Sequence, residues 1–180
     1  FQLTAGQVAA HWSERTQGVL LASPSNPTGT SILPDELQRI VQTVRKRGGF
    51  TIVDEIYQGL SYDQAPVSAL SFGDDVVTIN SFSKYFNMTG WRLGWLVAPA
   101  ELVPEFEKVA QNLFICASAV AQHAALACFE PQALAIYEDR KAEFRRRRDF
   151  IVPALESLGF KVPVKPDGAF YVYADCRGVD

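Results

Sequence analysis

The stretch that decides the predicted fold is residues 76–84, VVTINSFSK, an apolar run that ends in hydroxyl groups and a lysine. Comparable apolar runs stand at residues 19–22 and 50–53, and a further one follows at residues 93–98. Because these runs are continuously apolar rather than alternating, they are typical of parallel strands that helices cover on both faces. Apolar side chains at helical spacing follow Pro34 and complete a strand, helix, strand unit.

Helices are predicted to dominate the chain after residue 100, at about residues 100–113, 117–129 and 131–158. The stretch 113–129 is the most apolar, but it is shorter than a membrane span and contains Gln122 and His123. We therefore expect it to be a core helix. The last helix is long enough to leave one domain and enter another.

The predicted fold class is α/β: a three-layer sandwich with a mostly parallel sheet, followed by the start of a smaller α/β domain. We place the domain change inside the last helix, around Arg145. Residues 1–145 are then a partial large domain, and residues 146–180 begin the small domain with a strand at residues 169–173. The chain starts at Phe1 and stops soon after that strand, so we expect both ends to be cut.

The composition is that of a globular protein with little net charge, since 17 basic residues stand against 20 acidic ones. No nucleic acid and no membrane is expected as a partner. Three cysteines without a C-x-x-C pair favour reduced thiols and a cytoplasmic location. His11 and His123 lack metal-ligand spacing with the cysteines, so no metal site is predicted.

Polar side chains follow three of the predicted strands directly. Asn26 comes after the first strand, residues 54–57 (DEIY) after the second and residues 81–84 (SFSK) after the third. Ligands of open parallel sheets bind beyond the carboxyl ends of the strands, so these groups should meet in one crevice. An amide, a carboxylate, a phenol and an amine together suit an aromatic, phosphorylated ligand that carries a carbonyl group. The glycine-rich motifs of nucleotide-binding proteins do not occur.

These motifs, in their order, resemble the class I/II aminotransferases, which are pyridoxal phosphate enzymes of fold type I similar to aspartate aminotransferase. The resemblance rests on residues 25–29 (SNPTG), on DEIY and SFSK, and on residues 90–94 (GWRLG), and it covers nearly the whole chain. Each motif is weak alone. The combination of D-x-x-Y with Lys84 and, eight residues later, Arg92 is specific for this family.

The resemblance implies that Lys84 holds pyridoxal 5'-phosphate as a Schiff base, a link that only a primary amine forms. Lys84 would then move a proton from the substrate α-carbon to the cofactor, first as a base and then as an acid. Asp54 would pair with the pyridine nitrogen and keep it protonated. The plainer interpretations are a solvated surface lysine at Lys84 and, at Asp54, a cap of the turn after the strand.

By the same resemblance, Tyr57 and Asn26 hydrogen-bond the phenolic oxygen of the cofactor, and Arg92, Ser81 and Ser83 bind its phosphate. A guanidinium group matches two phosphate oxygens at once, and hydroxyl groups fill the remaining positions. The plainer alternatives are that Tyr57 is a core residue and that Asn26 forms a turn.

Lys84, Asp54 and Tyr57 are thus the predicted catalytic residues of an enzyme that moves an amino group between an amino acid and a 2-oxo acid. Alternatives are a lyase or synthase on the same fold, and a pyridoxal phosphate-binding regulatory domain of a transcription factor.

The resemblance also implies a homodimer and two family elements that the 180 residues do not contain. These elements are an upstream turn with an aromatic residue that stacks on the cofactor and a downstream arginine that binds the substrate carboxylate. Which amino acid and oxo acid react is therefore not indicated. We expect the 180 residues alone to be inactive and to bind the cofactor weakly or not at all.

Overall fold

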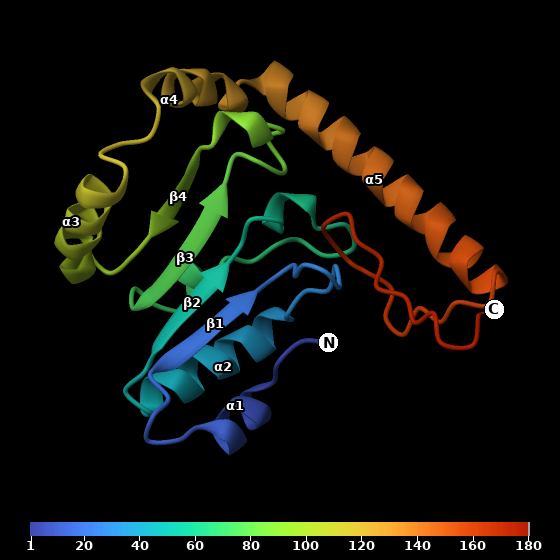
Figure 1. Cartoon of the computed structure of the whole chain (residues 1–180), viewed down its shortest axis with the longest axis horizontal. Coiled ribbons are helices and arrows are strands. Elements are labelled where there is room, and N and C mark those ends of the chain that lie inside the picture. The colour runs from blue at the N-terminus through green and yellow to red at the C-terminus, as the bar shows by residue number, and fades with distance from the viewer. Residues whose placement is uncertain (180) are drawn as a thin grey trace.

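A four-stranded sheet forms the centre of the computed structural model, which describes residues 1–179 (Figure 1). Its strand order is β1 (Gly18–Ala22), β2 (Phe50–Asp54), β3 (Val76–Ser81) and β4 (Gly94–Val97). The first three strands are parallel, and β4 runs antiparallel to β3. No α-helix separates β3 from β4, where the chain makes turns and one 3₁₀ turn at Thr89–Trp91. The predicted α/β fold with a mostly parallel sheet is confirmed.

The register of the parallel strands places their carboxyl ends side by side. Ala22 of β1 lies beside Asp54 of β2, which lies beside Ile79 of β3. Backbone pairing continues one residue further, because Ser23 N donates to Asp54 O (3.0 Å) and Glu55 N donates to Ile79 O (2.8 Å). The segments that follow β1 and β2 therefore leave the sheet at one edge.

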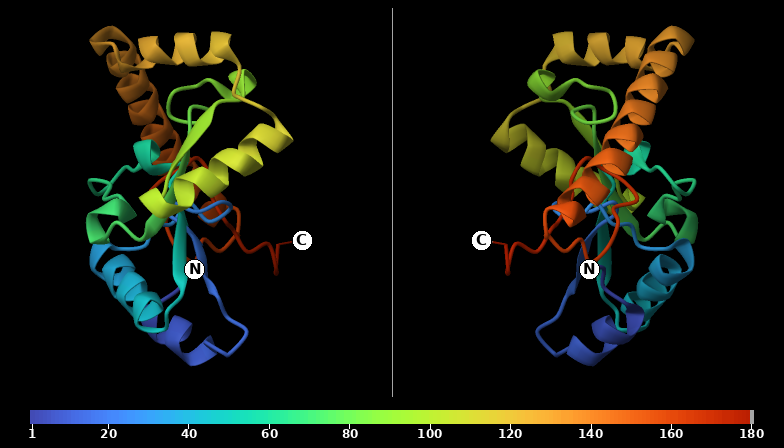
Figure 2. Two further views of the ribbon diagram at one scale, coloured as in Figure 1. Left: turned by 90° about the vertical axis from the view of Figure 1, so that its left-hand side faces the viewer. Right: turned by 90° about the vertical axis from the view of Figure 1, so that its right-hand side faces the viewer.

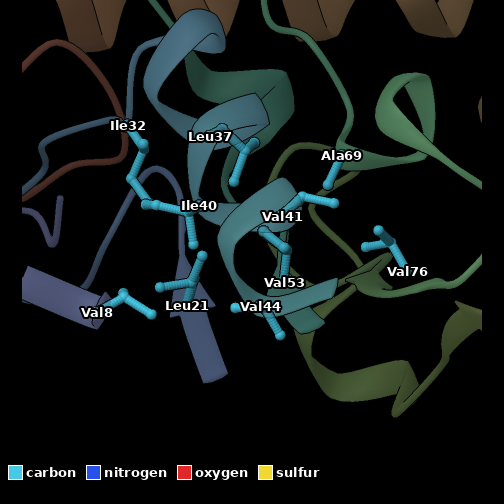
Figure 3. Packing of buried hydrophobic residues seen from close by; sticks show 10 residues of the cluster. All are labelled: Val8, Leu21, Ile32, Leu37, Ile40, Val41, Val44, Val53, Ala69 and Val76. Atoms are coloured by element: carbon cyan, nitrogen blue, oxygen red, sulfur yellow. The ribbon is translucent and has the colours of Figure 1, made fainter. Parts of the chain in front are cut away.

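Helices α1 (Ala5–His11) and α2 (Pro34–Lys46) cover one face of the sheet (Figure 1). Thr4 and Gln7 form a capping box at the start of α1, and α2 begins with a proline and two acidic residues. Figure 3 shows the resulting core, in which α2 inserts its apolar side chains between the strands and α1. Its members are Val8, Leu21, Ile32, Leu37, Ile40, Val41, Val44, Val53, Ala69 and Val76. Full burial of such a side chain contributes about 1.5–3 kcal/mol.

The opposite face of the sheet is covered unevenly. Helix α3 (Val103–Leu113) lies next to β4 (Figure 2), and Leu96 and Phe106 line a common groove. At the other end of the sheet, the side chain of Leu20 in β1 is 70% exposed. Within residues 1–179, the second helical layer is therefore present beside β4 and absent over β1.

A helix does lie within the predicted residues 117–129, but the expectation that the whole apolar stretch 113–129 is a core helix is wrong. Helix α3 ends at Leu113, an irregular segment follows, and α4 (Ala119–Leu126) continues into a 3₁₀ turn at Ala127–Phe129. Only small side chains of this stretch are buried. They are Ala121, Ala125 and Cys128, which belong to one cluster with Phe82, Met88 and Leu93. The large apolar side chains point outward, because the alanine face of α4 alone approaches the turn after β3. The exposed set is Leu113, Phe114, Ile115, Val120, Leu126 and Phe129.

Helix α5 (Pro131–Ser157) runs without a break through Arg145, so the domain boundary there stays a prediction. After α5, the strand predicted at residues 169–173 is not formed. Residues 159–179 contain only two isolated bridges, Lys161 with Asp175 and Gly168 with Ser61. The segment instead lies across the loops at the carboxyl edge of the sheet, because Gly168 N donates to Gly29 O and Ala169 N donates to Leu60 O. None of the helices in residues 1–179 combines the length and the apolar character needed to cross a membrane.

A buried arginine ties α5 to this segment. The Arg148 side chain is 5% exposed, and its Nη1 donates to Asp63 Oδ2 (2.6 Å) and to the carbonyl oxygen of Pro166 (3.0 Å). Its guanidinium also lies over the Tyr62 ring, 5.1 Å from the centroid. The charge pair and hydrogen bonds lower the pKa of Asp63. One side chain thus holds three separate parts of the chain together.

Replacement of Arg148 by alanine should lower the free energy of unfolding by about 1–3 kcal/mol, because Asp63 and the Pro166 carbonyl lose a buried partner. Urea denaturation of the full-length protein measures this loss. Arg146→Ala is the control, since Arg146 lies on the same helix with a 69% exposed side chain. Its loss should stay within about 0.5 kcal/mol. Equal losses of unfolding free energy in the two variants would show that Arg148 does not link α5 to Asp63 and Pro166.

Candidate active site

The turn after β3 holds Lys84 at the carboxyl edge of the sheet. Ser81 Oγ accepts a hydrogen bond from Ser83 N (3.0 Å), which closes a tight turn. Phe82 is buried within the cluster under α4, and its backbone N–H donates to Leu93 O (3.1 Å). The buried phenylalanine fixes the turn, so the next side chains are presented at the edge of the sheet.

The Lys84 amine lies between two aromatic rings. Its Nζ is 5.6 Å from the ring centroid of Tyr57 and 5.6 Å from that of Phe170. Among residues 1–179, no carboxylate forms a salt bridge with it. The amine is therefore held by packing and by contacts with ring faces, which leaves its hydrogen-bonding capacity for a ligand.

Asp54 and Tyr57 occupy the turn after β2. Asp54 Oδ1 accepts a hydrogen bond from Ile56 N (3.0 Å), so this carboxylate does cap its turn, and its Oδ2 has no hydrogen bond within the described chain. Tyr57 is 4% exposed, and its hydroxyl lies 2.7 Å from that of Tyr171. Burial, the Tyr171 hydroxyl and the negative charge of Asp54 all raise the pKa of Tyr57. The phenol is thus protonated at neutral pH, and both residues retain capacity for a ligand.

A buried carboxylate that the sequence motifs did not single out supports this turn. Glu55 accepts hydrogen bonds from Ala69 N (2.7 Å) and from Ser68 Oγ (2.9 Å), at the start of the 3₁₀ helix Ala69–Phe72. Burial raises the pKa of Glu55. These bonds keep Glu55 on the helix side of the sheet, and the neighbouring Asp54 consequently lies on the other face.

The loop after β1 carries Asn26. Hydroxyl groups of Ser25, Thr28 and Thr30 are hydrogen-bonded to one another inside the loop. Gly29 has a φ of 64°, and a Cβ there would lie 2.6 Å from Cβ of Pro166, so only glycine fits. The Asn26 side chain is exposed and has no hydrogen bond to another part of residues 1–179. The structure brings Asn26 to the same edge of the sheet as Tyr57, without a hydrogen bond between the two side chains.

Ser81 Oγ also donates a hydrogen bond to Leu93 O (3.2 Å). Ser81 therefore lies close to Arg92, the residue before Leu93. The exposed Arg92 adopts a left-handed conformation, with φ 52° and ψ 52°, and its Nη1 donates to Thr89 O (2.9 Å). Such a conformation is uncommon outside glycine, and the exposed guanidinium has no further hydrogen bond within residues 1–179. Ser83 differs from this pair because it is buried beneath the turn.

Two aromatic residues of the site come from the segment after α5. Phe170 packs edge-to-face on Tyr57 with a centroid distance of 5.4 Å, and Tyr171 does so at 5.6 Å. From the sequence, both are predicted in a strand of a second domain, with no role in the site. A proline, aspartate, glycine turn before an aromatic run was the only signal, and it does not indicate which distant residues the run contacts.

A cavity of about 190 Å³ adjoins Lys84 on the side of α5. Its lining includes Tyr85, Tyr137, Arg140 and Phe144, but neither Asp54 nor Tyr57. Lys84 therefore lies between this cavity and the cluster at the strand ends. Within residues 1–179, no group of three or more histidine, cysteine or acidic side chains is arranged to hold a metal ion.

Comparison with known proteins identifies the family. The family model for aminotransferase class I and II matches residues 1–180. Valine–pyruvate aminotransferase of Mycobacterium tuberculosis is 40% identical over 97% of this chain, and aspartate aminotransferase of Thermotoga maritima is 34% identical over 100% of it.

Solved structures agree with these relatives. The crystal structure of an aminotransferase from M. tuberculosis superposes with a TM-score of 0.91 at 40% identity, over 97% of this chain and 45% of that one. Aspartate aminotransferase from Thermus thermophilus with maleate gives 0.92 at 30% identity, over 97% of this chain and 46% of that one. The chain spans only 45% and 47% of the two curated relatives. With the family match along its whole length, this chain belongs to the class I and II aminotransferases.

Proposed function

We propose that the protein is a pyridoxal phosphate-dependent aminotransferase that moves an amino group between an amino acid and a 2-oxo acid. The observation that carries the proposal is the position of Lys84. Its amine lies against the Tyr57 ring, at the edge where β1, β2 and β3 all end. The relatives named above are all aminotransferases, which favours this activity over a lyase, a synthase or a regulatory domain on the same fold.

The donor set fits pyridoxal phosphate group by group. The unpaired amine of Lys84 suits an aldehyde, and the open Oδ2 of Asp54 suits a protonated ring nitrogen. The protonated phenol of Tyr57 suits a phenolic oxygen, and the exposed guanidinium of Arg92 suits a phosphate. When bound, the cofactor supplies a carbonyl that forms a Schiff base with a primary amine and a ring that accepts the electron pair of the substrate Cα–H bond.

Lys84 is the proton carrier in this proposal. With the cofactor and substrate bound, Nζ of Lys84 would accept the proton of the substrate α-carbon and deliver it to the cofactor carbon. The rings of Tyr57 and Phe170, each 5.6 Å from Nζ, restrict the movement of the amine. Confinement of this kind lowers the entropy cost of the transfer.

The other predicted residues bind and orient. Asp54 supplies a negative charge for the ring nitrogen of the cofactor. Tyr57 donates its O–H to the phenolic oxygen of the cofactor, and Asn26, in the loop after β1, donates to the same phenolic oxygen. Arg92 and Ser81 hold the phosphate. Ser83 is buried, and its backbone N–H already donates to Ser81 Oγ (3.0 Å), so Ser81 is the more accessible of the two serines.

We further propose that the protein works as a homodimer in the cytoplasm. The family resemblance supports the dimer, and the exposed apolar side chains of Leu113, Phe114 and Ile115 offer surface for association. Cys116, Cys128 and Cys176 are free thiols, which suits a reducing compartment.

Replacement of Lys84 by alanine should lower kcat/KM by about 10⁴-fold or more, because within residues 1–179 no other lysine directly follows a strand of the sheet. Borohydride reduction of the cofactor-loaded full-length protein, followed by peptide mass analysis, should place the adduct on Lys84. Lys108→Ala is the matched control, since Lys108 is exposed on α3, and it should keep full activity. An adduct on any other lysine would refute the proposed role.

Replacement of Asp54 by asparagine should lower kcat and kcat/KM together by about 10²-fold or more, with a smaller effect on cofactor affinity. Asparagine keeps the hydrogen bond to Ile56 N but loses the charge that holds the ring nitrogen protonated. Single-turnover kinetics measure the chemical step, and the exposed Asp74→Asn serves as control. An unchanged single-turnover rate in Asp54→Asn would show that this carboxylate does not face the ring nitrogen.

A further inference from the structure

The hydroxyl groups of Tyr57 and Tyr171 form a pair at the edge of the site, 2.7 Å apart. On the basis of the proposed function, we propose that Tyr171 is a positioning residue that donates its O–H to the Tyr57 oxygen, so that Tyr57 donates its own proton to the cofactor's phenolic oxygen. The two phenols then act as one relay, with Tyr171 behind Tyr57.

The direction of the bond follows from the available partners. Each phenol has one proton, so only one of the two can donate within the pair. Neither hydroxyl has another hydrogen-bond partner in residues 1–179, but of the two rings only that of Tyr57 contacts the Lys84 amine. Once a ligand oxygen accepts the Tyr57 proton, the Tyr57 oxygen needs a donor, and Tyr171 is the one in reach. Two hydrogen bonds in series polarise each other, so the outer bond strengthens.

Tyr171 is held firmly enough to do this. Ala169, two residues before it, is fully buried with a φ of 56°, and its N–H donates to Leu60 O (3.1 Å). The Tyr171 ring packs on the rings of Tyr57 and Phe170, at centroid distances of 5.6 Å and 4.8 Å. A segment 114 residues further along the chain thus fixes the orientation of the Tyr57 phenol.

Several charged or titratable groups surround the pair and act on any titration measured there. Asp54 comes from β2, Lys84 from the turn after β3, Tyr62 from the segment after Leu60, and Arg147 and Arg148 from α5. All of them stay in place when a single hydroxyl is removed. Tyr171→Phe therefore isolates the hydrogen bond, because the ring and its packing remain.

The test is a spectrophotometric pH titration of the full-length protein loaded with pyridoxal phosphate. The Tyr57 hydrogen bond stabilises the phenolic anion most in the unprotonated form of the chromophore, so weakening it raises the titration midpoint. Tyr171→Phe should raise the midpoint by about half to one pH unit, and Tyr57→Phe should raise it further. Tyr173→Phe, an exposed tyrosine two residues on, should not move it.

The double variant Tyr57→Phe/Tyr171→Phe tests whether Tyr171 changes the titration midpoint through the Tyr57 hydroxyl or independently of it. In the relay, Tyr171→Phe has no further effect once the Tyr57 hydroxyl is gone. An unchanged midpoint in Tyr171→Phe, or a shift that adds fully to that of Tyr57→Phe, would overturn the inference. Failure of the proposed function looks different: wild-type protein would then show no Lys84-dependent absorption band at any pH, and the inference would fall with it.

Discussion

The parallel pairing of β2 between β1 and β3 is the constraint on which the rest of the structure depends. Asp54 stands level with Ala22 and Ile79, so the three segments that follow leave the sheet at one edge. Because side chains alternate along a strand, a slip of one residue would exchange Asp54 with the fully buried Val53. The core between the sheet and α2 therefore fixes the register and, through it, the face on which the carboxylate lies.

The segment after α5 adds the second half of the site. Arg148 of α5 binds this segment at the Pro166 carbonyl and also binds Asp63, and Gly29 lets the segment approach the loop that carries Asn26. Phe170 and Tyr171 then reach Tyr57. The amine of Lys84 is consequently held between a ring that follows β2 and a ring from the far end of the chain. The strand ends provide the chemical groups, and the later segment limits their movement.

The sequence predicted what local patterns encode. Continuous apolar runs located all four strands to within about two residues, and the polar residues that follow them were correctly placed at one edge. The stretch 113–129 misled because high apolarity does not say which side chains are covered, and here only the small ones are. The aromatic run at residues 169–173 was read as a strand because its partners, Leu60 and Tyr57, lie more than a hundred residues earlier. Contacts of that separation leave no periodic signal, so the roles of Phe170 and Tyr171 emerge only from the folded chain.

A crystal structure of the full-length protein with pyridoxal phosphate bound tests the central claim most directly. The ring nitrogen should lie about 2.7–2.9 Å from an Asp54 carboxylate oxygen, with the aldehyde carbon at Lys84 Nζ and the phosphate at Arg92 and Ser81. A cofactor seated instead in the cavity between Lys84 and α5, with its phosphate near Arg140 and its ring nitrogen away from Asp54, would contradict the assignment of the site to the ends of the parallel strands.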